Sequence, residues 1–161
     1  MSRHTRPDAV DRAAGLTEGD ATFALRADRP EYLEGAEACR ASVLTPKDDL
    51  GLSPALRYAL ARRVALGGGN AALLAEYPAP EDSALTSLAE GRTPEDRRLR
   101  ALAAHADLIA RRPGAAGPED LAALQAAGIT VPQIIALSEL LAFVCFQIRI
   151  AHGLSLLKGT A

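Results

Sequence analysis

The chain contains no tryptophan, and aromatic residues make up only 4% of its 161 residues. Stacking platforms for single-stranded nucleic acids are built from aromatic side chains, so no such platform is expected. The chain also has no excess of either charge, since 18 basic residues accompany 20 acidic ones. Without a basic surface to neutralise phosphates, nucleic acid is not expected as a partner.

Cysteine and histidine are scarce as well. The two cysteines, Cys39 and Cys145, are far apart in the sequence and form no Cys-x-x-Cys motif. No histidine, cysteine or acidic residues share a helical spacing that would bring metal ligands together, so we expect no metal and no cofactor. Cysteines in this pattern are ordinarily reduced thiols, and residues 1–25 carry charges throughout with no apolar signal segment. Both observations favour a cytoplasmic location.

Apolar runs long enough to cross a membrane are not apparent in the sequence. The most apolar segment, residues 130–157, is interrupted by Glu139 and Arg149 and has Pro132 near its start. A spanning helix needs about 20 predominantly apolar residues in succession. We therefore predict no membrane partner.

What the chain does contain is enough apolar residues, 48%, to form the core of one domain. Strand patterns of alternating β-branched residues are absent, whereas helix start and stop signals recur. Ser53 and Pro54 begin a helix that the glycines at 67–69 end, and Asn70 caps a second, Ala71–Tyr77. The other helices predicted are Pro30–Ser42, Asp82–Glu90, Thr93–Arg112, Leu121–Ala127 and a long one over Thr130–Leu157. These patterns predict an all-α single domain.

The polar parts of the chain carry further expectations. Residues 1–29 are polar and broken by proline and glycine, so we predict a loosely ordered arm ahead of a helical domain at 30–157. Arg57 lies off the apolar stripe of its helix. His105 lies at the edge of the stripe of another helix, where a lone histidine is expected at the surface or its boundary.

The C-terminal helix predicted over Thr130–Leu157 is apolar on nearly every side, which is typical of a helix buried in a core. At about 100° per residue, one narrow stripe differs from the rest. It consists of Ser138, Ala142, Cys145, Arg149 and His152. A buried arginine needs a partner, because an unpaired buried charge is costly. The stripe is either a small polar pocket, in which Arg149 binds a carboxylate and His152 transfers protons, or a structural set paired with another helix.

Three stretches of the chain together point to a known family. Residues 52–77 read LSPALRYALARRVALGGGNAALLAEY, and the C-terminal half includes RLRALAAHADLIARRP and DLAALQAAGITVPQIIALSELLAFVCFQIRIAHGL. The first stretch resembles the core helical hairpin of the alkylhydroperoxidase D / carboxymuconolactone decarboxylase family. The other two resemble the C-terminal part of its peroxidase-related branch. The resemblance extends over about Pro30–Leu157, and it implies an alkylhydroperoxidase D-like helical bundle that assembles into a homo-oligomer.

The catalytic motif of that family is replaced in this chain. The motif comprises a glutamate, a Cys-x-x-Cys pair and a histidine, and those positions hold Tyr58, Asn70, Leu73 and Tyr77 here. In the motif, one thiolate attacks the peroxide and the second thiol resolves the sulfenic acid as a disulfide. Asparagine and leucine can do neither, so we predict loss of dithiol peroxidase activity. The four residues either line a pocket for a small ligand or serve only as a cap and as packing.

Functions of different classes therefore stay open. One is a small-ligand-binding or structural oligomer, with a small carboxylate or apolar ligand held by these four positions together with Ser138 and Cys145. Another is an enzyme of the decarboxylase or lactone type, in which Arg149 binds the substrate and His152 moves protons. A one-cysteine antioxidant peroxidase that uses Cys39 or Cys145 is the third alternative.

Overall fold

The computed structural model describes residues 6–160, and in this range the chain is all-α, with no strand. The helices are α1 (Ala9–Ala14), α2 (Ala21–Ala27), α3 (Pro30–Leu44), α4 (Pro54–Gly67), α5 (Ala71–Ala75), α6 (Ser83–Ala89), α7 (Arg97–Arg111), the 3₁₀ turn η1 (Pro113–Ala115), α8 (Pro118–Ala126) and α9 (Val131–Thr160). The all-α prediction is confirmed. Most of the predicted helices are present with nearly the same bounds.

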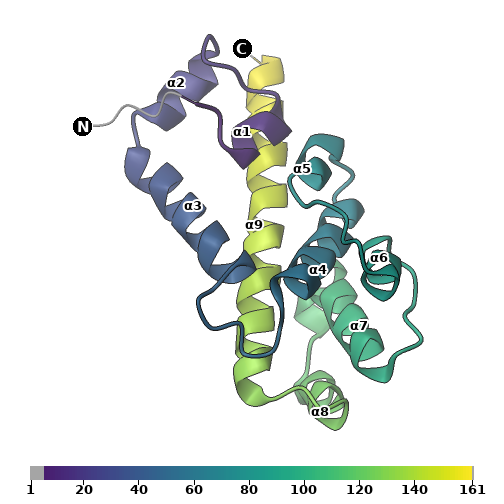
Figure 1. Ribbon diagram of the computed structural model, residues 1–161. Coiled ribbons are helices and arrows are strands. Elements are labelled where there is room, and N and C mark those ends of the chain that lie inside the picture. The colour runs from purple at the N-terminus through teal and green to yellow at the C-terminus, as the bar shows by residue number, and fades with distance from the viewer. Residues whose placement is uncertain (1–5, 161) are drawn as a thin grey trace.

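Helix α9 is the central element and runs the length of the molecule (Figure 1). Helices α1, α3, α4 and α7 pack against it. Helices α1 and α2 lie beside its C-terminal end, and α8 lies beside its N-terminal end (Figure 1). The core forms around α9, where Leu137, Leu140, Leu141 and Val144 are completely buried. Removal of this apolar surface from water is the main force that holds the other helices against α9.

Helix α4 is the second element of the core, and its local signals agree with the sequence. The Ser53 hydroxyl accepts a hydrogen bond from the Leu56 amide at 3.3 Å and so caps the helix. The buried apolar stripe of the helix comprises Leu56, Ala59, Leu60 and Val64. Beyond its end, the Asn70 side chain accepts from the Leu73 amide at 2.9 Å and caps α5. Both predicted caps are confirmed.

Helix α7 begins later than predicted. The capping signals in the sequence predict a start at Thr93, whereas the N-cap is Asp96, whose carboxylate accepts from the Leu99 amide at 2.8 Å. A carboxylate caps a helix as well as a hydroxyl does, and its negative charge also favours the positive end of the helix dipole. Thr93 and Pro94 therefore stay in the connecting segment. The end of the helix at Arg111 agrees with the prediction.

Residues 8–27 form two packed helices where the sequence predicts a loosely ordered arm. Asp8 and Asp11 cap α1 reciprocally, since each carboxylate accepts from the backbone amide of the other, at 2.7 and 3.0 Å. Arg26 of α2 pairs with both carboxylates. Val10 is 2% exposed and belongs to the main core. The charged residues pair with one another, so the polar composition conceals an apolar face; the first five residues of the predicted arm lie outside the described range.

Helix α9 leaves one face exposed, although its composition predicts burial on all sides. Val131, Ile135 and Phe146 are 55%, 56% and 46% exposed. By length and composition, Val131–Gly159 could cross a membrane, contrary to the expectation from Glu139 and Arg149. Within the fold, 56% of its apolar window is buried against other helices, as in the core helix of a bundle.

Two polar side chains are more buried than the sequence indicates. Arg57 is 2% exposed and donates to the carbonyls of Leu52, Val43 and Asp49 at 2.7, 2.9 and 3.0 Å. His105 is 6% exposed, and its Nδ1 has no hydrogen-bond partner in the described chain. The prediction of a surface or boundary histidine was wrong, because α8 packs against α7.

Candidate functional site

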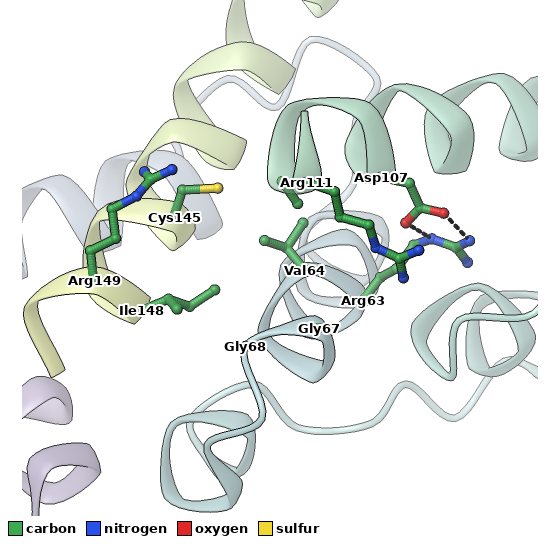
Figure 2. A pocket seen from close by; sticks show the side chains of 10 residues that line it. Arg63, Val64, Gly67, Gly68, Asp107, Arg111, Cys145, Ile148 and Arg149 are labelled. Atoms are coloured by element: carbon green, nitrogen blue, oxygen red, sulfur yellow. Dashed lines mark hydrogen bonds and ion pairs between the residues drawn. The ribbon is translucent and has the colours of Figure 1, made fainter. Parts of the chain in front are cut away.

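A cavity of about 150 Å³ lies where α4, α7 and α9 meet (Figure 2). Its described lining comprises Arg63, Val64, Gly67, Gly68, Asp107, Ala110, Arg111, Cys145, Ile148 and Arg149. Three arginines and one carboxylate line it, so positive charge is in excess. The cavity is partly open to solvent, and cationic side chains from α4, α7 and α9 converge on it.

Arg63 and Asp107 form the fixed polar wall of this cavity. Nε and Nη2 of Arg63 donate to Oδ1 and Oδ2 of Asp107, both at 2.9 Å, in a bidentate arrangement (Figure 2). The Nη1 group donates to the carbonyls of Leu88 and Arg92 at 3.0 and 2.8 Å. This pair therefore ties α4 to α7 and to the segment around α6. Because Arg63 is satisfied and neutralised, it serves as an anchor of the site.

Arg111 and Arg149 are in a different condition. Both residues are exposed, as is Arg112, and within residues 6–160 neither guanidinium has a hydrogen-bond or ion-pair partner. Figure 2 shows the Arg149 guanidinium beside Cys145 on α9, whereas the Arg111 side chain extends from α7 toward Arg63. Arg111 follows Asp107 by one helical turn, but the Asp107 carboxylate is already engaged by Arg63. Planar groups of N–H donors such as these suit an anionic ligand, and α7 and α9 each bring one to the lining of the same cavity.

The Cys145 thiol points toward the space between α9 and α7 (Figure 2). The residue is 7% exposed and forms no disulfide. Burial raises the pKa of this thiol above its ordinary 9.0, and the positive charge of Arg149 opposes that rise in part. At neutral pH the group is therefore a protonated thiol, which behaves as a small apolar surface and is a poor nucleophile.

The glycines after α4 allow α9 to approach closely on this side. Helix α4 ends at Gly67, and Gly68 follows it. A Cβ atom at Gly68 would lie 3.0 Å from Cγ2 of Ile148 and 3.2 Å from the carbonyl oxygen of Ala65. Both distances are shorter than ordinary contacts, so with a side chain at this position Ile148 would have to shift by a few tenths of an ångström. The narrow shape of the cavity thus depends on glycine at this position.

Comparison with known proteins adds no assignment. No family model, curated protein or solved structure matches this chain. Within the described residues, no group of three or more histidine, cysteine or acidic side chains is arranged to hold a metal ion. The chemistry of the site therefore has to be inferred from the side chains that line it.

The residues at the family motif positions lie outside the described lining of this cavity. Tyr58 is half-buried and packs against the core, and Leu73 is completely buried. Besides capping α5, Asn70 donates from Nδ2 to the carbonyl of Ala13 at 2.8 Å, which joins α5 to the end of α1. Each of the three has structural contacts that account for its side chain.

Tyr77, at the fourth motif position, belongs to a buried polar network. Its hydroxyl donates to Oε1 of Gln147 on α9. Arg40 of α3 donates to the same oxygen at 3.3 Å and to the carbonyl of Glu76 at 2.6 Å, and it lies 4.9 Å from the Tyr77 ring centre. Burial raises the pKa of Tyr77 to about 12, so the phenol stays neutral and donates. The network holds α3, α9 and the segment after α5 together.

The structure brings together only part of the predicted polar stripe on α9. Cys145 and Arg149 line the cavity. Ser138 is exposed, and its hydroxyl donates to the carbonyl of Ile134 at 2.8 Å. His152 is exposed and lies outside the described lining. Arg149 therefore shares this cavity with Cys145 and not with His152.

Three charged residues of the site are not predicted from the sequence. Arg63, Asp107 and Arg111 come from α4 and α7 and meet only through the packing of those helices on α9. Asp107 and Arg111 are four residues apart on one helix, a spacing that places them on one face. That signal is visible in the sequence, but it also describes an ordinary ion pair on a helix surface. Nothing in the sequence indicates that Asp107 pairs with Arg63 and not with Arg111.

Proposed function

We propose that the chain is a binding protein for a small organic anion, held in the cavity between α4, α7 and α9. The observation that carries the proposal is the pair Arg111 and Arg149, which flank one cavity without partners among residues 6–160. Each guanidinium offers a planar set of N–H donors that fits a carboxylate in bidentate geometry. The positive charge on both walls favours an anion between them.

The size and lining of the cavity favour a ligand with a short apolar part. A volume of 150 Å³ is that of about five water molecules at roughly 30 Å³ each. Val64, Ala110 and Ile148 provide an apolar wall beside the arginines. A monocarboxylate with a short hydrocarbon chain fits both conditions, because its charged end meets the guanidinium groups and its chain meets the apolar wall.

The groups around the cavity favour binding of a ligand over catalysis of a reaction. Cys145 has a raised pKa, and the other cysteine, Cys39, lies exposed in α3. His152, the proton-transfer group of the decarboxylase or lactone alternative, lies outside the described lining. We therefore propose an alkylhydroperoxidase D-like relative whose dithiol peroxidase activity is lost and whose ligand site lies between α4, α7 and α9.

Calorimetric titration with butyrate tests this proposal, with sodium chloride at matched ionic strength as the reference. Saturable binding is expected for the unmodified chain. Arg111→Ala should weaken it by roughly tenfold or more, since a hydrogen bond to a charged group contributes about 1.5–3 kcal/mol. Arg112→Ala is the matched control, because Arg112 is the exposed neighbour outside the described lining and should leave affinity unchanged.

Two outcomes would contradict the proposal. Butyrate binding that is absent, or equally weakened by the two arginine variants, would mean that the cavity is not an anion site. Labelling of Cys145 by a sulfenic-acid trap after peroxide treatment would show that this thiol reacts with peroxide. The function would then be that of a one-cysteine peroxidase, which the position of Cys145 in the cavity allows. Cys145→Ser should leave butyrate affinity nearly unchanged if the proposal holds.

A further inference from the structure

The exposed face of α9 has the spacing of a coiled-coil seam. Its members are exposed or half-buried and recur at alternating steps of four and three residues: Ile135, Glu139, Ala142, Phe146, Arg149 and Gly153. These are the steps of the a and d positions of a heptad, which face a partner helix. Three members of this seam, Glu139, Ala142 and Phe146, also line a groove of about 600 Å³ between α3 and α9, which is largely apolar. The seam has no covering helix in the described chain.

When two copies of α9 run antiparallel, small side chains on the seam of one copy face large side chains on the seam of the other. In that arrangement each a position meets a d position of the other helix. Ala142 then meets Phe146 of the second copy, so a small residue faces a large one that is 46% exposed. Ile135, 56% exposed, meets Gly153 of the second copy, and a Cβ atom added at Gly153 would meet nothing within 4 Å.

The charges along the seam are complementary in the same register. Glu139 meets Arg149 of the second copy, and Arg149 meets Glu139 in turn. Neither residue forms a salt bridge within residues 6–160. A parallel arrangement would instead place Glu139 against Glu139 and Phe146 against Phe146, with like charges opposed and two large side chains competing for one space. Size and charge thus favour the same antiparallel register.

We propose that this seam is the interface of a homodimer in which the two α9 helices pack antiparallel, with Ala142 and Phe146 at its centre. A second copy of the chain is the partner that satisfies the charge and size pattern at once. The dimer does not rest on the proposed anion site, although Arg149 lies at the edge of both. In the dimer, Glu139 of the second copy offsets the charge of Arg149, so Arg111 then provides the main attraction for an anion. The five N–H donors of Arg149 still allow it to donate to that anion.

Sedimentation equilibrium of the full chain tests the proposal. A concentration-dependent dimer is expected. Phe146→Glu should shift the protein to monomer, because it puts two carboxylates into the centre of the seam. Leu121→Glu, at a 45% exposed leucine of α8 away from the seam, is the matched control and should leave the dimer intact. Circular dichroism of each variant checks that the helices are retained.

Charge exchange tests the register itself. Glu139→Arg and Arg149→Glu should each weaken dimerisation by roughly tenfold, because each places like charges opposite one another. The double variant with both exchanges should restore affinity to near that of the unmodified chain. A chain that stays monomeric at high micromolar concentration, or a double variant no better than the single ones, would overturn the proposal. A monomer that binds phosphatidylglycerol vesicles through Phe146 would also overturn it, in favour of a lipid surface.

The two proposals fail in distinguishable ways. Arg111 does not lie on the seam, so Arg111→Ala should weaken anion binding while the dimer persists. Phe146 does not line the cavity, so Phe146→Glu should abolish the dimer while anion binding persists.

Discussion

Arginine side chains are the main polar ties of this fold, and several of them hold backbone carbonyls. Arg57 donates to three carbonyls around the loop before α4, and Arg62 donates to the carbonyls of Leu74 and Tyr77 at 3.2 and 2.7 Å. A planar guanidinium suits this task, because its five donors can reach several chain segments at once. Against this background, the two unpaired arginines of the cavity are informative about function.

His105 gives a prediction about pH at the same scale. Burial lowers the pKa of its imidazole from the ordinary 6.5, and the negative charge of Asp120 opposes this in part. As the pH falls below 6.5, the unfolded chain takes up a proton that the folded chain does not. The free energy of unfolding is therefore expected to decrease below this pH, and to be fully recovered above it. Urea unfolding on either side of pH 6.5 measures the effect.

Two variants isolate the contribution of this histidine. His105→Leu removes the titrating group, so its stability should vary less with pH over the same interval. His152→Gln is the control, because His152 is exposed and its replacement should keep the pH dependence of the unmodified chain. The same pH dependence in His105→Leu and in the unmodified chain would show that another group is responsible.

At the scale of elements, the contact between the end of α4 and α9 controls the shape of the cavity. Gly68 faces Ile148 so closely that an added Cβ atom would lie 3.0 Å from it, whereas an added Cβ atom at Gly67 would meet nothing within 4 Å. Two adjacent glycines therefore have different roles. Gly68 allows the approach of two helices, and Gly67 is the last residue of a helix with open space beside it.

This difference predicts opposite effects of the same substitution. Gly68→Ala should lower the free energy of unfolding by about 1–3 kcal/mol, as overpacking commonly does. It should also weaken anion binding, because Gly68 and Ile148 line the cavity. Gly67→Ala should be neutral or stabilising by up to about 1 kcal/mol, because alanine is the better helix former. Chemical unfolding of both variants checks this, and equal destabilisation would contradict the proposed close approach.

At the scale of the whole molecule, the N-terminal helices are part of the core. Asp8 and Asp11 are buried, with side chains 3% and 0% exposed, and Arg26 neutralises both of them. Leu16 and Phe23 form a second small cluster with Ala14, against which Leu154 of α9 packs. The segment therefore closes the C-terminal end of α9, and the stability of the whole fold should depend on it.

Arg26→Ala tests that dependence. Loss of the guanidinium removes the cation that pairs with both buried carboxylates, so the free energy of unfolding should fall by about 3 kcal/mol. Arg29→Ala is the matched control, because Arg29 pairs with Glu31 at the surface, where 60% and 59% of the two side chains are exposed, and little change is expected. Thermal unfolding distinguishes the two, and equal stability of both variants would mean that residues 8–27 do not support the core.

The sequence by itself determined the all-α class, most helix bounds and the caps at Ser53 and Asn70, because these depend on local hydrogen bonds and on the periodicity of apolar residues. It also indicated Arg149 and Cys145 as members of one helix face. Only the tertiary structure decided which faces are covered. It put Arg63 against Asp107, left Arg111 unpaired, buried His105 under α8 and left one side of α9 open to solvent. These outcomes depend on contacts between residues far apart in the chain, and such contacts leave no mark on local spacing.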